Sequence, residues 1–93
     1  MPLYIVAYDV KTPHQKAVKD KLLANGFSNR IPVGGGGFRQ LPDTTVAVNA
    51  GSSKEAFERF HSLATSAVQS AGVVERAVAV GASDYWMTGE SSN

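Results

Sequence analysis

The sequence predicts a small α+β fold with one antiparallel sheet and one layer of helices. Two segments carry apolar residues at helical spacing, and four carry the apolar and β-branched residues typical of strands. In chain order the expected elements are a strand over 3–10, a helix over about 13–25, strands over 27–33 and 45–50, a helix over about 53–71 and a strand over 73–80. This order is that of a ferredoxin-like βαββαβ plait. We therefore expect a four-stranded antiparallel sheet with two helices on one face, and with 3–10 and 45–50 at its centre.

The first strand, Leu3 to Val10, is apolar on both faces until Asp9 interrupts it. Because successive residues of a strand point to opposite faces, both faces of this one must be covered, which is typical of a central strand. Asp9 stands where the strand leaves the sheet, and open α/β layers tend to bind their ligands at such an edge. Asp9 is therefore the first candidate for chemistry.

Both expected helices have recognisable ends. Thr12 is suited to cap the first helix, and Asn25-Gly26 tolerates the left-handed conformation that ends it. Ser52 and Glu55 have the spacing of a capping box at the start of the second helix, and Gly72 is expected to end it. An apolar stripe along the second helix predicts that it packs on the sheet.

Four consecutive glycines, Gly34 to Gly37, predict a loop or a hairpin tip, because ordering them costs conformational entropy. Pro32 places the strand before them at a sheet edge, since proline has no N–H to donate. A loop or a ragged strand is expected over 38–44. The glycine run is not the phosphate-binding loop of a nucleotide hydrolase, since Phe38 and Arg39 follow it where Lys and Ser or Thr would be needed.

The chain of 93 residues fits one domain, which we place at 1–88 with a disordered tail over 89–93. The segment over 83–87 is expected to be either a short fifth strand or an anchored tail. The sequence has no cysteine, so neither a disulfide framework nor a thiolate metal site is available. No apolar run approaches the roughly 20 residues of a membrane span, and no signal-peptide pattern is present. These features predict a soluble cytoplasmic protein with no membrane partner.

The net charge of +1 is small, but it is unevenly distributed. The first 42 residues contain six Lys and Arg against two Asp, whereas the remainder contains three against six Asp and Glu. A basic half is where phosphate contacts are expected, although a single lysine can equally belong to a solvated helix face. The residues expected to contact nucleic acid are Lys11, Lys16, Lys19, Arg30 and Arg39.

The alternation of side chains along the strands predicts two different sheet faces. The bulky face is expected to contain Val6, Val46, Val48, Val78 and Val80. The small-residue face is expected to contain Ala7, Ala47, Ala77 and Ala79. Because two helices cover only one face of the sheet, the uncovered apolar face predicts a homodimer in which two sheets pack face to face. Asp9 is two residues after Ala7 and so points to the same face as Ala7, which places it toward that interface if the valine face meets the helices.

Two features have alternative interpretations. Asp9 is either a metal ligand or general base, or a cap that accepts backbone N–H groups from the start of the first helix. A pair of such acids across a dimer favours the first, because magnesium sites often use one or two protein carboxylates. Tyr85-Trp86-Met87 is expected to dock on a partner subunit, and the alternative is stacking on bases.

Several stretches resemble a known group of proteins. These are YIVAYDV followed by a basic helix, FRQLPDTTVAV before a capped helix, and an ending in SDYW. Together they resemble the ferredoxin-like CRISPR-associated adaptation nuclease superfamily, and within it the GhoS-type endoribonuclease antitoxins. The resemblance implies a homodimer that cleaves RNA or DNA. It also implies that Asp9 is the catalytic and metal-site residue and that Lys16 and Lys19 correspond to basic residues of the first helix.

The chain departs from that pattern in its four-glycine loop and in the lack of a second obvious catalytic residue. The leading hypothesis is a dimeric nucleic-acid-binding protein, and specifically an endoribonuclease of toxin-antitoxin or CRISPR-related type. Asp9 would hold Mg²⁺ or another divalent cation, with RNA as the first expected substrate and DNA as the second. The alternative is a non-catalytic dimeric module that binds a protein or a small effector, with Asp9 as a helix cap.

Overall fold

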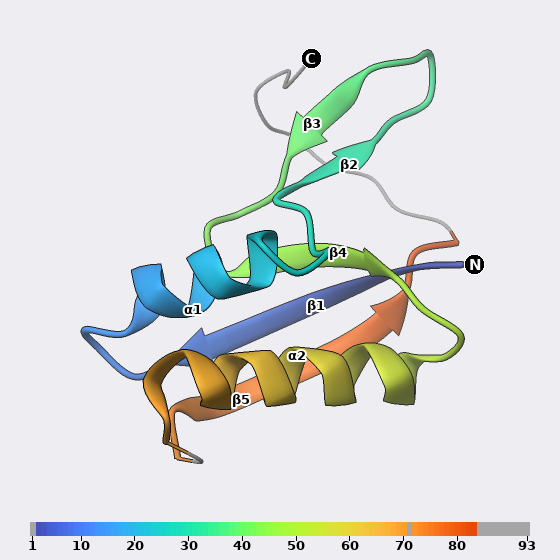
Figure 1. Cartoon of the computed structure of the whole chain (residues 1–93). Helices are drawn as coiled ribbons and strands as arrows, with labels where there is room; N and C mark the ends of the chain where they lie inside the picture. The colour runs from blue at the N-terminus through green and yellow to red at the C-terminus, as the bar shows by residue number, and fades with distance from the viewer. Residues whose placement is uncertain (1, 71, 84–93) are drawn as a thin grey trace.

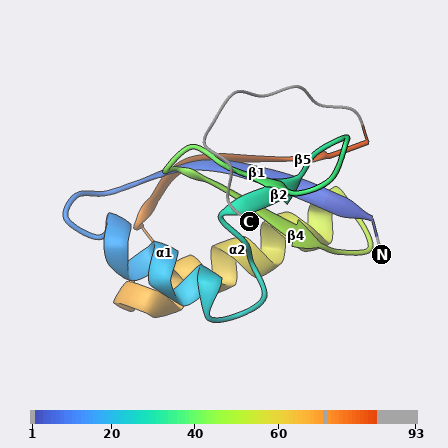
Figure 2. The same cartoon turned by 90° about the horizontal axis from the view of Figure 1, so that it is seen from above.

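The computed structural model describes residues 2–70 and 72–83, and it has two layers (Figure 1). Its elements are β1 (Leu3–Val10), α1 (Gln15–Leu23), β2 (Arg30–Pro32), β3 (Phe38–Gln40), β4 (Thr45–Asn49), α2 (Ser53–Val68) and β5 (Val74–Gly81). Both helices lie on the same side of the main sheet, as Figure 2 shows. The fold is thus the small α+β arrangement that the sequence predicts. Neither helix in the described part of the chain is long and apolar enough to cross a membrane.

The main sheet has three antiparallel strands in the order β4-β1-β5, so β1 is central as expected. The predicted four-stranded sheet is wrong, and so is the central position predicted for 45–50, because β4 is an edge strand of the main sheet. Of the expected second strand, only Ser28 pairs with the main sheet, through one bridge to Ala47 of β4. From Arg30 onward the chain instead forms a separate hairpin, β2-β3, which lies beyond β4 (Figure 1).

The hairpin turns at the glycine run, which confirms the expected hairpin tip. Gly35, Gly36 and Gly37 all have positive φ, a conformation that side chains rarely adopt. The Val33 N–H donates to the Gly37 carbonyl at 3.2 Å and closes the turn. The segment over 38–44, expected as a loop or ragged strand, therefore supplies the short strand β3. Because residues 30–32 pair with β3 in this hairpin, the expected strand over 27–33 does not become a strand of the main sheet.

The first helix begins later than the sequence predicts. Its N-cap residue is His14, which makes no side-chain capping hydrogen bond. The Thr12 hydroxyl instead accepts a hydrogen bond from the Gln15 side chain at 2.8 Å. Neither Thr12 nor Asp9 therefore caps α1, so the interpretation of Asp9 as a helix cap is wrong. At the other end, Gly26 has φ of 94°, as expected for the residue that follows a helix.

The second helix begins as predicted and ends early. Ser52 accepts a hydrogen bond from the Glu55 N–H at 3.1 Å, and the Glu55 carboxylate accepts one from the Gly51 N–H at 2.5 Å. These two bonds satisfy amide groups that have no partner within the helix. The helix ends at Val68 because Gln69 adopts a left-handed conformation with φ of 53°. Gly72 is therefore not the residue that ends it.

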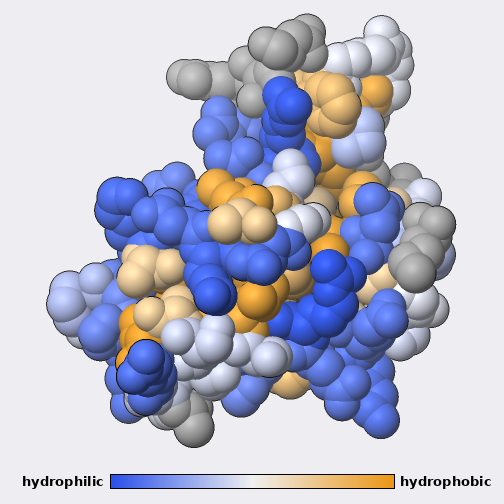
Figure 3. Space-filling model, viewed as in Figure 1, coloured by the Kyte–Doolittle hydropathy of each residue, from blue (hydrophilic) through white to orange (hydrophobic). Residues whose placement is uncertain are grey.

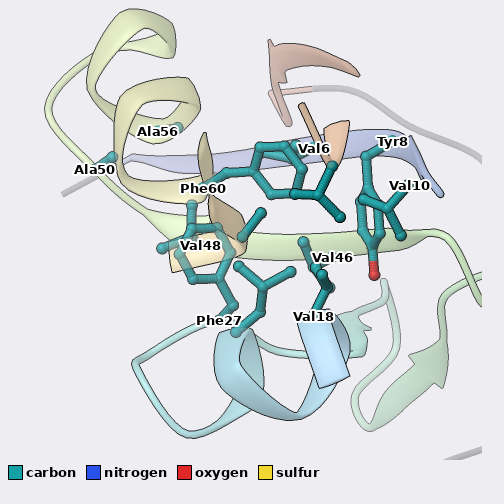
Figure 4. Close-up of a cluster of buried hydrophobic side chains, with 13 residues drawn as sticks. Val6, Tyr8, Val10, Val18, Phe27, Val46, Val48, Ala50, Ala56 and Phe60 are labelled. Carbon is teal, nitrogen blue, oxygen red and sulfur yellow. The ribbon is translucent and has the colours of Figure 1, made fainter. Parts of the chain in front are cut away.

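The core lies between the main sheet and the two helices (Figure 4). Val6, Tyr8 and Val10 project from β1 into this layer, and each is at most 5% exposed. Val18 of α1 and Phe60 of α2 pack against the same cluster, and both are fully buried. The opposite, solvent-facing side of the helices is largely hydrophilic (Figure 3). One face of β1 is thus sealed by the helices.

The register of β5 reverses one part of the predicted face pattern. Ala79 pairs with Val6, whereas Val78 pairs with Ala7 and Val80 with Ile5. Ala77 and Ala79 therefore point toward the helices, and Val78 and Val80 lie on the face without helices. Val78 and Val80 are 55% and 49% exposed. The prediction that they share the bulky face of Val6 is wrong, and the open face is bulkier than expected.

The β2-β3 hairpin and the segment after it cover part of this open face. Ile31 and Leu41 form a second buried cluster with Ala47 of β4, and Leu3 and Ile5 pack against it. The cover is on the β4 side of the sheet. What remains exposed is a surface that we name the open-face patch, made of Ala7, Asp9, Arg76, Val78 and Val80.

Some predictions concern residues that the structure does not describe. The Tyr85-Trp86-Met87 cluster, the tail over 89–93 and all of the expected fifth strand except Ser83 lie outside the described ranges. These predictions stay as they are.

Candidate nucleic-acid interface

Asp9 forms an ion pair with Arg76, which lies directly opposite it on β5. The Arg76 Nε donates a hydrogen bond to Asp9 Oδ2 at 2.6 Å. The Asp9 side chain is 45% exposed and that of Arg76 is 79% exposed. The hydrogen bond and the charge of the carboxylate raise the pKa of Arg76 above its ordinary value. The predicted site residue is thus accessible, but its carboxylate already has a cationic partner.

An open hollow of about 370 Å³ surrounds this ion pair. It is lined by Ala7, Tyr8, Asp9, Thr44, Arg76, Ala77 and Val78. The register of β1 and β5 shifts between Asp9 and Val10, which is an irregularity of the ladder directly beside the ion pair. Asp9 therefore lies at the strand end where the sequence places it, in a shallow and mainly apolar depression.

A second hollow, of about 390 Å³, lies beside α1. We name it the lysine hollow, and it is lined by Tyr8, Gln15, Lys16, Lys19, Asp20, Asp43 and Thr44. It shares Tyr8 and Thr44 with the Asp9 hollow. The Tyr8 N–H donates to the Thr44 carbonyl at 2.9 Å, so a paired segment of backbone separates the two hollows. Asp9, which lines the first hollow, and the pair Lys16 and Lys19, which line the second, are therefore in neighbouring hollows.

The two lysines of the lysine hollow already have partners in the chain. Lys16 Nζ lies 2.6 Å from Asp20 Oδ2, one helical turn away, and both side chains are mostly exposed. Lys19 Nζ donates to the Asp43 carbonyl oxygen at 2.9 Å. Exposed pairs of this kind contribute at most about 1 kcal/mol, so a phosphate can replace such partners at small cost. Both ammonium groups therefore remain able to bind an anion.

Tyr8 gives the wall between the hollows a fixed position. Its side chain is buried against Phe60, and the ring centroids are 5.0 Å apart. Burial raises the pKa of the Tyr8 phenol, and the negative charge of Asp43 raises it further. Tyr8 therefore stays neutral at physiological pH, and its packing against Phe60 holds it in place between the two hollows.

Lys11 belongs to the same end of the molecule. It follows β1 directly, and its N–H donates to the Val73 carbonyl at 2.9 Å. A Cβ added at Gly72 would lie 3.7 Å from Lys11 Nζ, so the ammonium group is held near the start of β5. Lys11 thus lies with Asp9 at the end of β1, while Lys16 and Lys19 line the lysine hollow beside α1.

Arg30 and Arg39 are not brought to that end. Both lie on the β2-β3 hairpin, which extends beyond β4, whereas Asp9 pairs with the strand at the opposite edge (Figure 1). The guanidinium carbon of Arg30 lies 4.7 Å from the centre of the Phe38 ring, a cation–π contact within the hairpin. The predicted phosphate contacts therefore divide into a lysine group and an arginine group on different parts of the surface.

The described residues do not form a ligand group for a divalent cation. Within residues 2–70 and 72–83, no three His, Asp or Glu side chains come together as a ligand group. Among the residues that the structure describes, Asp9 is the only carboxylate lining its hollow, and the neighbouring positive charge of Arg76 opposes binding of a second cation. The Asp9 site of one chain is therefore an ion-pair site, and a magnesium site would need carboxylates from elsewhere.

Sequence reasoning missed Arg76. A signal was present, since Glu75 and Arg76 interrupt an otherwise apolar final strand much as Asp9 interrupts the first. Pairing Arg76 with Asp9 requires the register of β1 against β5, which depends on contacts between distant segments rather than on local pattern. No family model, curated protein or solved structure matches this chain.

Proposed function

We propose that the protein is a homodimer that binds nucleic acid, RNA in preference to DNA, through the lysines at the end of β1. The observation that carries the proposal is the position of Lys11, Lys16 and Lys19 at one end of the molecule, with two of them lining one hollow. Lysine ammonium groups bind phosphates through charge and release counterions, so such a cluster suits a nucleic-acid backbone. The preference for RNA follows from the resemblance to GhoS-type proteins, and the cysteine-free chain suits a reducing cytoplasm.

The Lys16–Asp20 ion pair of the lysine hollow allows a test with two opposite outcomes. Replacing Lys16 and Lys19 by Ala should weaken binding of a single-stranded RNA oligonucleotide by roughly five- to tenfold per lysine at low salt. Asp20→Asn removes the carboxylate that pairs with Lys16 and should strengthen binding. Fluorescence anisotropy of a labelled oligonucleotide measures both.

Lys54→Ala is the matched control, because Lys54 is an exposed lysine of α2 outside the lysine hollow. Equal losses for the Lys54 and Lys16 variants would show only a general charge effect. A Lys16 and Lys19 double variant that binds RNA as tightly as the wild type would contradict the proposal.

Nucleic-acid binding is the core of this proposal, and cleavage of the bound RNA is a second step that the proposal does not require. The predicted endoribonuclease activity depends on Asp9, and residues 2–70 and 72–83 contain no group of three side chains that could hold a divalent cation. We therefore assign no step of a reaction to a metal. Cleavage of labelled RNA that Asp9→Ala abolishes would establish the activity, and cleavage at the wild-type rate would remove Asp9 from it.

The Asp9–Arg76 ion pair favours a second function, a non-catalytic module that binds a protein or small effector. An acid fully paired on an apolar surface is typical of an interaction face rather than of a nuclease site. The two functions separate on a heparin column. Retention that moderate salt abolishes supports nucleic-acid binding, whereas elution at very low salt together with no RNA shift at micromolar protein supports the module.

A further inference from the structure

Arg76 turns one edge of its guanidinium group toward Asp9 and leaves a second edge open. The hydrogen bond to Asp9 uses Nε, so the carboxylate lies on the side of the guanidinium next to the side-chain stem. A guanidinium has five N–H donors, and its two terminal nitrogens, Nη1 and Nη2, form a separate fork that matches the oxygens of a phosphate. The Arg76 side chain is 79% exposed, so a ligand in solution can reach this fork.

Arg59 shows the opposite arrangement, a guanidinium whose terminal nitrogens serve the fold. Its Nη1 donates to the Asn49 carbonyl at 2.9 Å, and a Cβ added at Gly26 would lie 3.4 Å from its Nη2. Within residues 2–70 and 72–83, the Arg76 guanidinium has Asp9 as its only hydrogen-bonding partner, and that bond leaves the terminal nitrogens out. The fork of Arg76 is therefore available for binding, whereas that of Arg59 is not.

The hollow around Asp9 connects this fork to the lysine hollow. Its lining runs from Thr44, just before β4, across Ala7 of β1 to Arg76 of β5, so the hollow crosses the sheet. Thr44 is exposed and lines the lysine hollow as well. The volume of about 370 Å³ lies within the range of small-ligand sites, and the small apolar side chain of Ala7 leaves room for a sugar or a base.

We propose that this hollow binds the phosphate group of one nucleotide through the terminal nitrogens of Arg76. The inference rests on the proposed function and adds a phosphate contact to those of the lysines. A ligand with repeated anionic groups meets Lys16 and Lys19 on one side of Thr44 and Arg76 on the other. A single nucleic-acid strand has such groups along its backbone.

Asp9 is on this account a positioning residue. Its carboxylate accepts the Nε–H of Arg76 and so holds the guanidinium in one orientation. A long side chain that is already held loses less conformational freedom when it binds a ligand, which strengthens binding. Asp9 therefore acts through Arg76 and does not itself contact the phosphate.

Variants of Arg76 test the phosphate contact. Arg76→Ala should weaken binding of a single-stranded RNA oligonucleotide by roughly five- to tenfold at low salt. Arg76→Lys should recover only part of this loss, because an ammonium group keeps the charge but lacks the fork. Lys54→Ala, an exposed lysine of α2, is the control and should lose less than Arg76→Ala. Wild-type affinity of Arg76→Ala in fluorescence anisotropy overturns the inference.

Variants of Asp9 separate orientation from charge. Asp9→Asn and Asp9→Ala both remove the negative charge, but only Asn keeps an oxygen that can accept the Nε–H. The Ala variant should therefore bind RNA roughly three- to tenfold more weakly than the Asn variant. This difference should vanish when Arg76 is also replaced by Ala. Equal affinities of the two Asp9 variants, with circular dichroism confirming both folds, overturn the positioning role.

Inorganic phosphate tests the fork without RNA. Titration of the wild type with phosphate at constant ionic strength should shift the Nε–H signal of Arg76 in proton–nitrogen NMR and leave that of Arg59 in place. A phosphate titration that leaves the Arg76 signal unchanged overturns the inference, whether or not RNA binds. Failure of the proposed function has a different signature, because the Arg76 signal then shifts as expected while no labelled RNA binds to the wild type.

Discussion

The rings of Tyr8 on β1 and Phe60 on α2 lie with their centroids 5.0 Å apart and their planes tilted by 39°. This contact joins the central strand to the longer helix, and it also fixes the residue that separates the two hollows. Offset and tilted aromatic pairs contribute about 0.5–1.5 kcal/mol beyond the burial of their area. The stability of the core and the shape of the candidate site therefore depend on the same pair.

Phe60→Ala should cost about 3–5 kcal/mol in the free energy of unfolding, because Phe60 is fully buried and its removal leaves a cavity. Phe57→Ala, on the same helix but 36% exposed, should cost much less. Urea denaturation followed by circular dichroism measures both variants. Similar losses for the two would mean that Phe60 is not the anchor of α2.

The Ser52 cap gives a second prediction. Ser52→Ala removes the acceptor of the Glu55 N–H and should destabilise the protein by about 1 kcal/mol. Ser53→Ala is the control, since Ser53 is an exposed residue inside the first turn, where Ala is at least as favourable. Thermal denaturation would contradict the capping role if both variants melted at the same temperature.

The raised pKa of Tyr8 predicts a loss of stability at high pH. In the folded protein the phenol holds its proton to a higher pH than in the unfolded chain, where its pKa is about 10. The unfolded state therefore binds fewer protons above about pH 10, and stability falls as pH rises through the folded pKa.

Tyr8→Phe keeps the ring and removes the ionisation, so its free energy of unfolding should fall less steeply above pH 10 than that of the wild type. Tyr4→Phe is the control, because Tyr4 is only partly buried and lines neither hollow. Urea titrations at pH 8 and at pH 11 compare the three proteins. Parallel pH dependence of the wild type and Tyr8→Phe would show that Tyr8 does not titrate differently on folding.

The single carboxylate at the Asp9 site gives a prediction about divalent cations. Adding Mg²⁺ at constant ionic strength, or EDTA, should leave the melting temperature of the wild type unchanged, because Asp9 is paired with Arg76. A calcium-containing sample at equal ionic strength controls for non-specific effects. A rise in melting temperature with Mg²⁺ that Asp9→Asn abolishes would show that Asp9 is a metal ligand.

The sequence was sufficient for features that depend on local pattern. The two-faced run of β1, the apolar stripe of α2 and the Ser52–Glu55 cap are all observed where they were expected. Each of them is determined by residues within a few positions of one another. The placement of Asp9 at the end of the central strand follows from the same kind of information.

Features that depend on pairing between distant segments were not predictable in this way. Ser28 and Ala47 exchange two backbone hydrogen bonds of 2.8 Å each. Within the described residues, this bridge is the only strand pairing between the expected strand over 27–33 and the main sheet. Val6 pairs with Ala79 and not with Val78, and a shift of one residue moves every side chain of a strand to the other face of the sheet. The faces of β5 are therefore the reverse of those predicted. The same register determined that Arg76 meets Asp9.

The central claim is that the lysines at the end of β1 bind nucleic acid as part of a dimer. The most direct measurement is the dissociation constant of a wild-type complex with single-stranded RNA at several salt concentrations. With about six lysine contacts per dimer, log Kd should rise with log salt concentration with a slope of about 4. No complex at micromolar protein in low salt, or an affinity that salt does not change, would contradict the claim.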